Sequence, residues 1–252
     1  MKRFACRLLV SILLFLSTVS ARLAAQRLTP ADEVDPLVGT AKSIRPTMWE
    51  SNGATFPGVL APFGMVQITP DGYHYTDTQI RGFSYLDHSS GWGSSGRFLI
   101  FPYTGTVANP SSYTHDHEKA HPWQYDVDLA DYHIHASFTA TLHAGYARFV
   151  FPASTESHIR LSDLSKLTII ADTGLTGYCQ GTWFTAHFSK PFHVGHLDST
   201  EITVDFTTTA GETIDIRTGF STTSITAAAA NLRQEMPTGD FESYSHEGRQ
   251  RW

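Results

Sequence analysis

The sequence predicts an all-β fold, an antiparallel β-sandwich that is followed by a helical segment near the C-terminal end. Short runs rich in aromatic and β-branched residues recur from residue 55 onward, as expected for strands. Turn-forming residues separate these runs at close intervals, which is typical of antiparallel sandwiches rather than of parallel α/β sheets. Residues 224–235, in contrast, are rich in alanine and include leucine, arginine and glutamate, all of which favour an α-helix.

The first 25 residues are typical of a secretory signal peptide. A basic start with Lys2, Arg3 and Arg7 precedes an apolar run at 8–19, and small residues follow as far as Ala25. An apolar run of this length is too short for a comfortable membrane span. We therefore expect cleavage after Ala25 and a secreted or periplasmic chain without a membrane segment. The alternative is an uncleaved N-terminal anchor helix.

Cleavage changes both the charge and the cysteine content. It removes four of the 18 basic residues and none of the 24 acidic ones, so the mature chain carries a net charge of about −10. This sign argues against nucleic acid and anionic membrane surfaces as partners. Cys179 is then the only cysteine, so packing without a disulfide must hold the core. We expect Cys179 to be buried as a small apolar residue.

Several of the predicted strands alternate apolar with polar residues. The predicted strands are residues 65–68, 98–101, 132–138, 146–151, 167–170, 181–188, 200–207 and 213–220. In 132–138 one face carries Tyr132, Ile134, Ala136 and Phe138, and the other carries His133, His135 and Ser137. We therefore expect His133 and His135 at the surface.

The C-terminal part is predicted to be helical. After the helix at 224–235, a break at 237–239 precedes a second amphipathic stretch that carries Phe241, Tyr244 and Trp252. This stretch has no helix-end signal and nothing in the sequence for its apolar residues to pack against, so we expect an exposed apolar patch. The predicted organisation is a signal peptide at 1–25, a β-sandwich domain at 26–222 and a helical linker at 223–252. The linker leads toward a partner domain that is missing from this chain.

Residues 51–72 read SNGATFPGVLAPFGMVQITPDG. Three prolines and four glycines interrupt this apolar run, so neither a regular helix nor a single regular strand is expected. We predict a conformationally fixed loop that runs into the strand at 65–68. Its side chains Phe56 and Phe63 are expected to be buried against the sandwich or against another domain.

A glycine- and serine-rich segment at 87–96 is the candidate binding loop. It contains Asp87, His88 and Trp92. An indole ring can stack on the apolar face of a sugar, while carboxylate and imidazole groups form hydrogen bonds with its hydroxyls. The alternative is a plain connecting loop between two strands.

Other polar residues give weaker signals. The segment His-Asp-His-Glu at 115–118 could bind a metal ion, because a His-x-His spacing can place two imidazoles on one side of a strand. No third ligand stands at a diagnostic spacing. Carboxylates are available at Asp71, Asp77, Asp87 and Asp116, but the sequence cannot pair two of them at the separation that glycoside hydrolysis needs. We therefore predict neither a catalytic pair nor a metal site in this chain.

Taken in order, these stretches resemble the N-terminal domain of glycoside hydrolase family 92, whose members are secreted exo-acting α-mannosidases of bacteria. The resemblance runs from residue 34 to residue 252 and includes Phe-Pro-Gly at 56–58, Pro-Phe-Gly-Met-Val-Gln at 62–67, Gly-Phe-Ser at 82–84, His-Ser-Ser-Gly-Trp-Gly at 88–93 and Asn-Leu-Arg-Gln-Glu at 231–235. One departure stands out. Where the family pattern has the first of two histidines, this chain has Tyr85 or Leu86.

The resemblance implies a β-sandwich of the galactose-mutarotase-like supersandwich type that packs on a helical (α/α) barrel. Family members are calcium-dependent, inverting mannosidases. Their general acid, general base and calcium ligands lie mainly in the barrel, while loops of the sandwich complete the sugar pocket. This chain would then need the barrel as its partner and would hold no cofactor of its own.

We therefore expect His88, Trp92 and Asp87 to face the terminal sugar of a mannose-containing glycan, with Phe56 and Thr55 nearby. The chain alone is expected to hydrolyse little or no substrate. Two alternatives stay open. One is a stand-alone carbohydrate-binding module, and the other is a structural cell-surface sandwich without affinity for sugar.

Overall fold

The computed structural model describes residues 29–41, 55–86, 97–238 and 240–252. The predicted signal peptide lies outside these residues. The chain divides into two compact units, 1–33 and 34–252. The described residues of the first unit form one short 3-10 helix, η1 (Pro30–Glu33), and the Asp32 carboxylate accepts a hydrogen bond of 2.6 Å from the Thr29 amide. The other described elements belong to the second unit.

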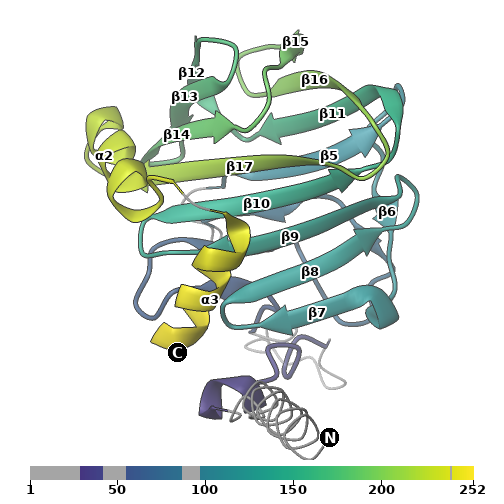
Figure 1. Ribbon diagram of the computed structural model, residues 1–252, viewed down its shortest axis with the longest axis vertical. Helices are drawn as coiled ribbons and strands as arrows, with labels where there is room; N and C mark the ends of the chain where they lie inside the picture. Colours follow the sequence, from purple (N-terminus) through teal and green to yellow (C-terminus); the bar gives the residue numbers. More distant parts are fainter. Residues whose placement is uncertain (1–28, 42–54, 87–96, 239) are drawn as a thin grey trace, which may run out of the picture. The chain divides into compact units, whose positions relative to one another are not determined.

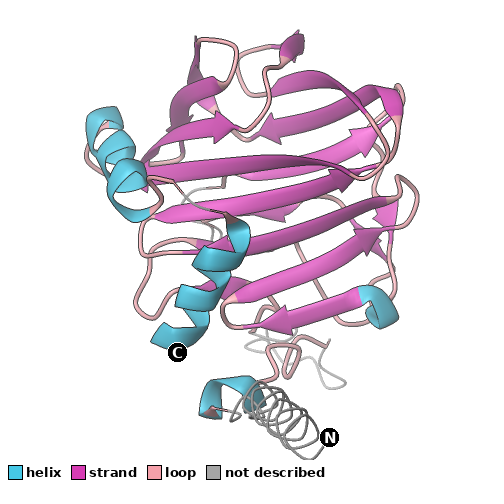
Figure 2. Ribbon diagram, in the orientation of Figure 1, coloured by secondary structure: helices cyan, strands magenta, loops and turns pink. Residues whose placement is uncertain are grey.

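The second unit is an antiparallel β-sandwich, as the sequence predicts (Figures 1 and 2). One sheet contains, in spatial order, β1 (Val59–Leu60), β2 (Gln67–Pro70), β4 (Phe83–Ser84), β5 (Leu99–Thr104), β11 (Ser154–Ser162), β16 (Ile202–Thr208) and β15 (His193–Leu197). The other contains β12 (Ser165–Ile170), β13 (Gly174–Cys179), β14 (Thr182–Phe188), β17 (Glu212–Ser221), β10 (Ala144–Phe151), β9 (Ile134–Ala140), β8 (Gln124–Leu129) and β7 (Glu118–His121). Two short strands, β3 (Gln79–Ile80) and β6 (Ser111–Ser112), pair separately.

Each predicted strand corresponds to a strand of the structure, although several ends differ. The strand predicted at 132–138 starts only at Ile134, because His133 has a φ of 53° and lies in a turn. His133 and His135 are exposed, as predicted, whereas Ser137 is buried. The sequence analysis did not predict β7, β8, β11, β13 and β15, nor the two-residue strands β1, β3, β4 and β6. Strand β8 alternates Tyr125, Val127 and Leu129 with polar residues, so its period-2 signal was present in the sequence.

The core between the two sheets is dominated by aromatic rings. The Phe83 ring lies 4.4 Å from that of Phe138 on β9, and Phe98 lies 4.9 Å from Phe184 on β14 and 5.4 Å from Phe220 on β17. Tilted and edge-on contacts of this kind add to the gain from burying the rings. Cys179 is buried, as predicted, and this burial raises the pKa of its thiol to about 12.

The predicted helix at 224–235 is α2 (Ile225–Glu235). It starts at Ser224, whose hydroxyl caps the helix by accepting a hydrogen bond of 3.1 Å from the Ala227 amide. The helix lies so close to β17 that a Cβ atom at Gly219 would come within 2.5 Å of the Ala228 carbonyl oxygen. Among the described helices, none combines the length and the apolar character that a membrane span requires.

The second helix, α3 (Phe241–Arg251), lies across the outer face of the larger sheet (Figure 1). Phe241 and Tyr244 are only 1% and 6% exposed, and their rings lie 5.5 Å and 5.8 Å from that of Tyr146 on β10. The expected exposed apolar patch is therefore wrong for these two residues, while Trp252 is 43% exposed. The sequence of the helix did not reveal the apolar surface that receives it, because Ala144 and Tyr146 belong to a strand far away in the chain.

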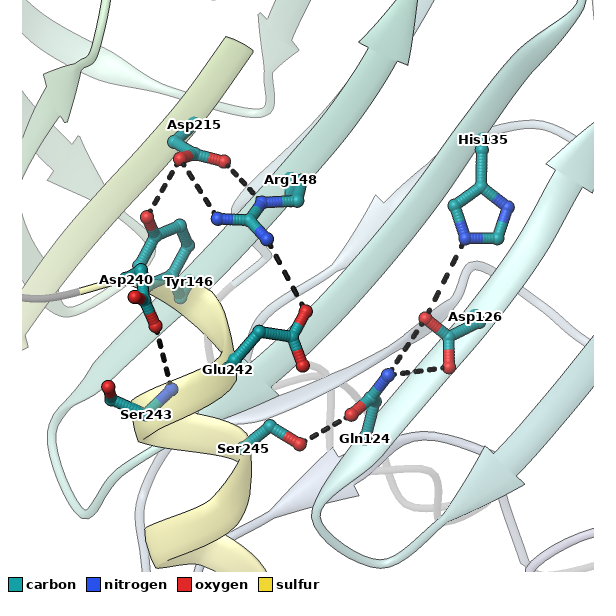
Figure 3. Close-up of polar contacts among 10 residues, drawn as sticks. All are labelled: Gln124, Asp126, His135, Tyr146, Arg148, Asp215, Asp240, Glu242, Ser243 and Ser245. Carbon is teal, nitrogen blue, oxygen red and sulfur yellow. Dashed lines mark hydrogen bonds and ion pairs between the residues drawn. The ribbon is translucent and has the colours of Figure 1, made fainter. Parts of the chain in front are cut away.

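Polar contacts hold the start of α3 on the sheet (Figure 3). The Arg148 guanidinium lies 5.0 Å from the centroid of the Phe241 ring, donates to Asp215 at 2.9 Å and reaches Glu242 at 3.5 Å. The Tyr146 hydroxyl also donates to Asp215, at 2.9 Å. Burial, together with the Asp215 carboxylate, raises the pKa of Tyr146 to about 12. The helix is thus joined to the sandwich by both apolar and charged contacts.

We predict that Phe241→Ala lowers the free energy of unfolding by about 3 kcal/mol, because it leaves a cavity between α3 and β10. The matched control, Trp252→Ala, removes a larger but exposed ring and is expected to cost less than about 1 kcal/mol. Urea unfolding followed by circular dichroism measures both values. Equal effects of the two substitutions would contradict the packing of Phe241 described above.

Candidate functional site

A polar cavity of about 420 Å³ lies at the segment that follows β2. Its lining includes Asp71, His74, Thr76, Asp77, Thr78 and Arg81. The segment turns at Gly72, which has a φ of 63°. The Asp77 carboxylate then accepts a hydrogen bond of 2.9 Å from the His74 amide and closes a second turn. The Nδ1 atom of His74 is buried and has no hydrogen-bond partner among the described residues, so a ligand could supply one.

Arg97 connects this cavity to the candidate binding loop. It is the first described residue after 87–96, and its guanidinium binds the Asp71 carboxylate through two nitrogens, with Nε at 3.0 Å from Oδ1. The side chains are 34% and 11% exposed. Paired hydrogen bonds between arginine and a carboxylate fix orientation as well as distance. The C-terminal end of the 87–96 segment is therefore attached to the lining of the cavity.

The N-terminal end of the same segment is fixed by burial. Tyr85 and Leu86 are 0% and 2% exposed, and the Tyr85 amide donates to the Phe98 carbonyl at 3.0 Å. Both side chains are therefore part of the core and not of a surface site. The predicted site residues Asp87, His88 and Trp92 lie outside the described residues.

Thr55 and Phe56 stand at the start of the next described range. Thr55 is exposed, and its hydroxyl donates to the Val38 carbonyl at 2.9 Å, while Phe56 is half-buried. The turn that contains Val38 also contains Thr40, whose carbonyl accepts a hydrogen bond of 3.3 Å from the amide of Tyr75, beside the cavity. Thr55 is thus linked to the cavity through this turn.

The predicted loop before β2 is present, but one of its aromatic residues is not where the sequence suggested. The loop needs Gly58, because a Cβ atom there would lie 1.9 Å from the Ile68 carbonyl oxygen. Phe63 has a φ of 61° and is fully exposed. Phe63 therefore does not pack against the sandwich, and its burial against another domain stays a prediction. The sequence pattern identified an apolar residue but not the direction in which the left-handed backbone turns it.

The buried carboxylate of Glu118 forms hydrogen bonds with residues next to the cavity. Glu118 accepts hydrogen bonds from the hydroxyls of Tyr125 at 2.6 Å and Tyr73 at 3.0 Å, and its Oε2 lies 2.6 Å from the His115 Nδ1 atom. Burial, together with the Glu118 charge, raises the pKa of Tyr73 well above its usual range, so this phenol stays a donor. His115 also lies 2.8 Å from the Tyr75 carbonyl. The sequence analysis did not identify this network, because its members are distant in the chain.

The proposed His-x-His pair does not converge on one site. His115 binds Glu118 inside the network, whereas His117 lies 3.2 Å from Asp128 on β8. The cavity lining offers donors and acceptors that suit a polyhydroxylated ligand. It does not offer a free pair of carboxylates, since Asp71 binds Arg97 and Asp77 binds a backbone amide.

Known proteins resemble this chain in sequence and in fold. The model of the glycosyl hydrolase family 92 N-terminal domain matches residues 33–228. The GH92 α-mannosidase BT3965 from Bacteroides thetaiotaomicron superposes with a TM-score of 0.76 at 28% identity, and the inverting mannosidase BT2199 from the same organism with a TM-score of 0.77 at 27% identity. Each alignment covers 88% of this chain but only 37% and 35% of the respective mannosidase.

The GH92 glycosyl hydrolase ccman5 shares the fold with a TM-score of 0.72 at 22% identity, again over 88% of this chain and 36% of its own. No curated protein sequence matches the chain. This chain therefore spans little more than a third of the length of these solved structures.

We predict that Asp71 and Arg97 are coupled by about 1 kcal/mol in a double-mutant cycle of Asp71→Asn and Arg97→Gln. The coupling should shrink in about 1 M salt, because Arg97 is partly exposed. The exposed pair Glu247 and Arg251, treated in the same way, should give about 0.3 kcal/mol. Unfolding free energies of the single and double variants measure both couplings, and a value near zero for the first pair would contradict its role as an anchor.

Proposed function

Because this chain belongs to the glycosyl hydrolase family 92 N-terminal domain family, we propose that it is the sugar-contacting β-sandwich of a secreted bacterial α-mannosidase-like enzyme. The observation that carries the proposal is the position of the residues that flank 87–96. Arg97 binds Asp71 in the lining of a polar cavity, and Tyr85 is buried in the core.

In this proposal Trp92 stacks on the apolar face of a mannose unit, and Asp87 and His88 form hydrogen bonds with its hydroxyls. Thr55 and Phe56 border the same pocket. The unpartnered Nδ1 atom of His74 is a further group that could bind a hydroxyl. The natural ligand is a mannose-containing glycan.

The catalytic groups belong, in this proposal, to a helical barrel domain of the whole enzyme. The mannosidases that resemble this chain are nearly three times as long as the part it matches, which leaves room for such a domain. The exposed ring of Phe63 is suited to contact it. The calcium ion is also assigned to the barrel. His196, Asp198 and Glu201 have donor atoms within 4.8 Å of one another, but this set includes an imidazole, and calcium prefers an all-oxygen set.

A stand-alone carbohydrate-binding module is the second candidate. The burial of Phe241 and Tyr244 favours it, because a linker whose apolar residues were left without a partner would expose them instead. The two candidates agree on sugar binding by this chain and differ in whether a barrel domain completes the pocket.

We predict that residues 26–252 bind methyl α-D-mannoside and that Trp92→Ala weakens this binding at least about tenfold, since loss of a stacking ring costs on the order of 1 kcal/mol. Titration calorimetry or ligand-observed NMR measures the affinity. The control Trp252→Ala removes an indole outside the site and should leave the affinity unchanged. Absence of any binding would favour a purely structural sandwich and overturn the proposal.

We further predict that residues 26–252 do not hydrolyse an aryl α-mannoside, with or without added calcium. The physical reason is that hydrolysis needs a carboxylic acid and a carboxylate that both reach the glycosidic bond. Release of the coloured phenol measures turnover directly. Turnover above the rate of a heat-denatured sample would show that the chain contains its own catalytic pair.

A further inference from the structure

Two histidines from different parts of the chain converge on one carboxylate at the outer face of the larger sheet. The Nδ1 atom of His135 lies 2.5 Å from Oδ1 of Asp128, and the Nδ1 atom of His117 lies 3.2 Å from Oδ2 of the same residue. The three side chains are 45%, 44% and 67% exposed in the order His135, Asp128, His117. They also border a cavity of about 520 Å³, whose other walls include Val150, Phe151 and Pro152.

Strand register brings these groups together. Asp128 on β8 stands directly opposite His135 on β9, and side chains opposite each other on one face of an antiparallel pair are close neighbours. His117 reaches the same carboxylate from the end of the 3-10 helix η2 (His115–His117), which precedes β7. The spacing of histidines along the sequence could not predict this grouping, because its members come from three separate elements.

A second carboxylate lies on the far side of the His135 ring. Oδ1 of Asp126 is 3.8 Å from the Nε2 atom of His135, and both oxygens of Asp126 accept hydrogen bonds from the Gln124 amide. The Gln124 side chain in turn accepts a hydrogen bond from Ser245 on α3 (Figure 3). A carboxylate on the second nitrogen of a metal-binding histidine is the usual arrangement that fixes the ring and raises its basicity.

The carboxylates of Asp126 and Asp128 have no lysine or arginine partner among the described contacts. Their ion pairs within the described ranges involve only histidines. Lys119 stands opposite Asp126 in the ladder of β7 and β8 but forms no ion pair with it among the described contacts. Two carboxylates this close together attract a dication.

We propose that His117, Asp128 and His135 form a binding site for a transition-metal dication such as Zn²⁺, with Asp126 as the carboxylate that orients His135. Two imidazole nitrogens and one carboxylate oxygen suit zinc, whereas calcium and magnesium prefer oxygen ligands alone. In the structure the donor atoms of these three residues do not all lie within 4.8 Å of one another, so metal binding requires the exposed side chains to rotate to the short distances that zinc needs. Water completes the coordination. This site is independent of the sugar-binding proposal.

A competing cluster on another hairpin is less suited to this role. His196, Asp198 and Glu201 have donor atoms within 4.8 Å of one another, but Asp198 already accepts hydrogen bonds from the amides of Thr200 and Glu201. These bonds lower the pKa of Asp198 to about 2. They also form the turn, and the turn explains why Asp198 lies where it does. The cluster also contains only one imidazole. It therefore serves as a matched control.

Titration calorimetry of the full chain, without a histidine tag, with Zn²⁺ tests the proposal. We expect saturable binding at this site, at least tenfold weaker in His117→Ala and in His135→Ala and unchanged in His196→Ala. Asp126→Asn should weaken binding less than loss of a direct ligand does. Addition of Ca²⁺ should not displace the Zn²⁺. The absorption spectrum of the Co²⁺-loaded chain gives a second measurement, since His135→Ala should abolish the visible bands of the bound ion.

The proposal would be overturned by any of three results. These are the absence of Zn²⁺ binding, full affinity in both His117→Ala and His135→Ala, or a loss that follows His196→Ala instead. Because the substituted histidines are exposed, circular dichroism should show that all variants stay folded. A variant that unfolds is replaced by the corresponding His→Gln substitution, which keeps the polar side chain but removes the imidazole.

Discussion

The burial of Tyr85 between the two sheets is the contact on which the candidate site depends. Its ring lies 5.1 Å from that of Phe98 in its own layer and 5.9 Å from that of Phe220 in the other. Gly145 leaves room for it, since a Cβ atom there would come within 2.6 Å of the ring. The Tyr85 hydroxyl has no partner among the described residues, so apolar packing holds the ring, while backbone hydrogen bonds with Phe98 and Gln67 hold the main chain. The chain enters the candidate binding loop directly from this buried position.

A second constraint is the buried carboxylate of Glu118. A carboxylate without solvent is costly unless donors satisfy it, and Glu118 is satisfied by Tyr125, Tyr73 and His115. These partners come from β8, from the segment that follows β2 and from η2, so a single buried side chain connects three parts of the chain. Apolar packing thus fixes the residues before 87–96, and a polar network fixes the segment next to the cavity.

The C-terminal helix α3 packs on the outer face of the larger sheet. Phe241 and Tyr244 bury their rings against Tyr146, and Arg148 bridges the sheet and the helix. The helix is therefore part of the folded unit rather than a free linker. Through Ser245 it also steadies the side chains around the histidine cluster. Any domain that follows this helix in a longer enzyme would be held in a defined direction relative to the sheets.

The sequence by itself determined the fold class, the family and eight of the 17 described strands, because alternation, helix propensity and the proline–glycine pattern are local properties of the chain. It also marked the 87–96 loop, whose site residues stay predictions. Only the tertiary structure decided which side chains meet. In the structure His115 contacts Glu118, whereas His117 contacts Asp128. Phe63 is exposed and Phe241 is buried. The physical reason is that such contacts depend on strand register and on backbone direction at single residues, and neither is encoded in the spacing of residues along one chain.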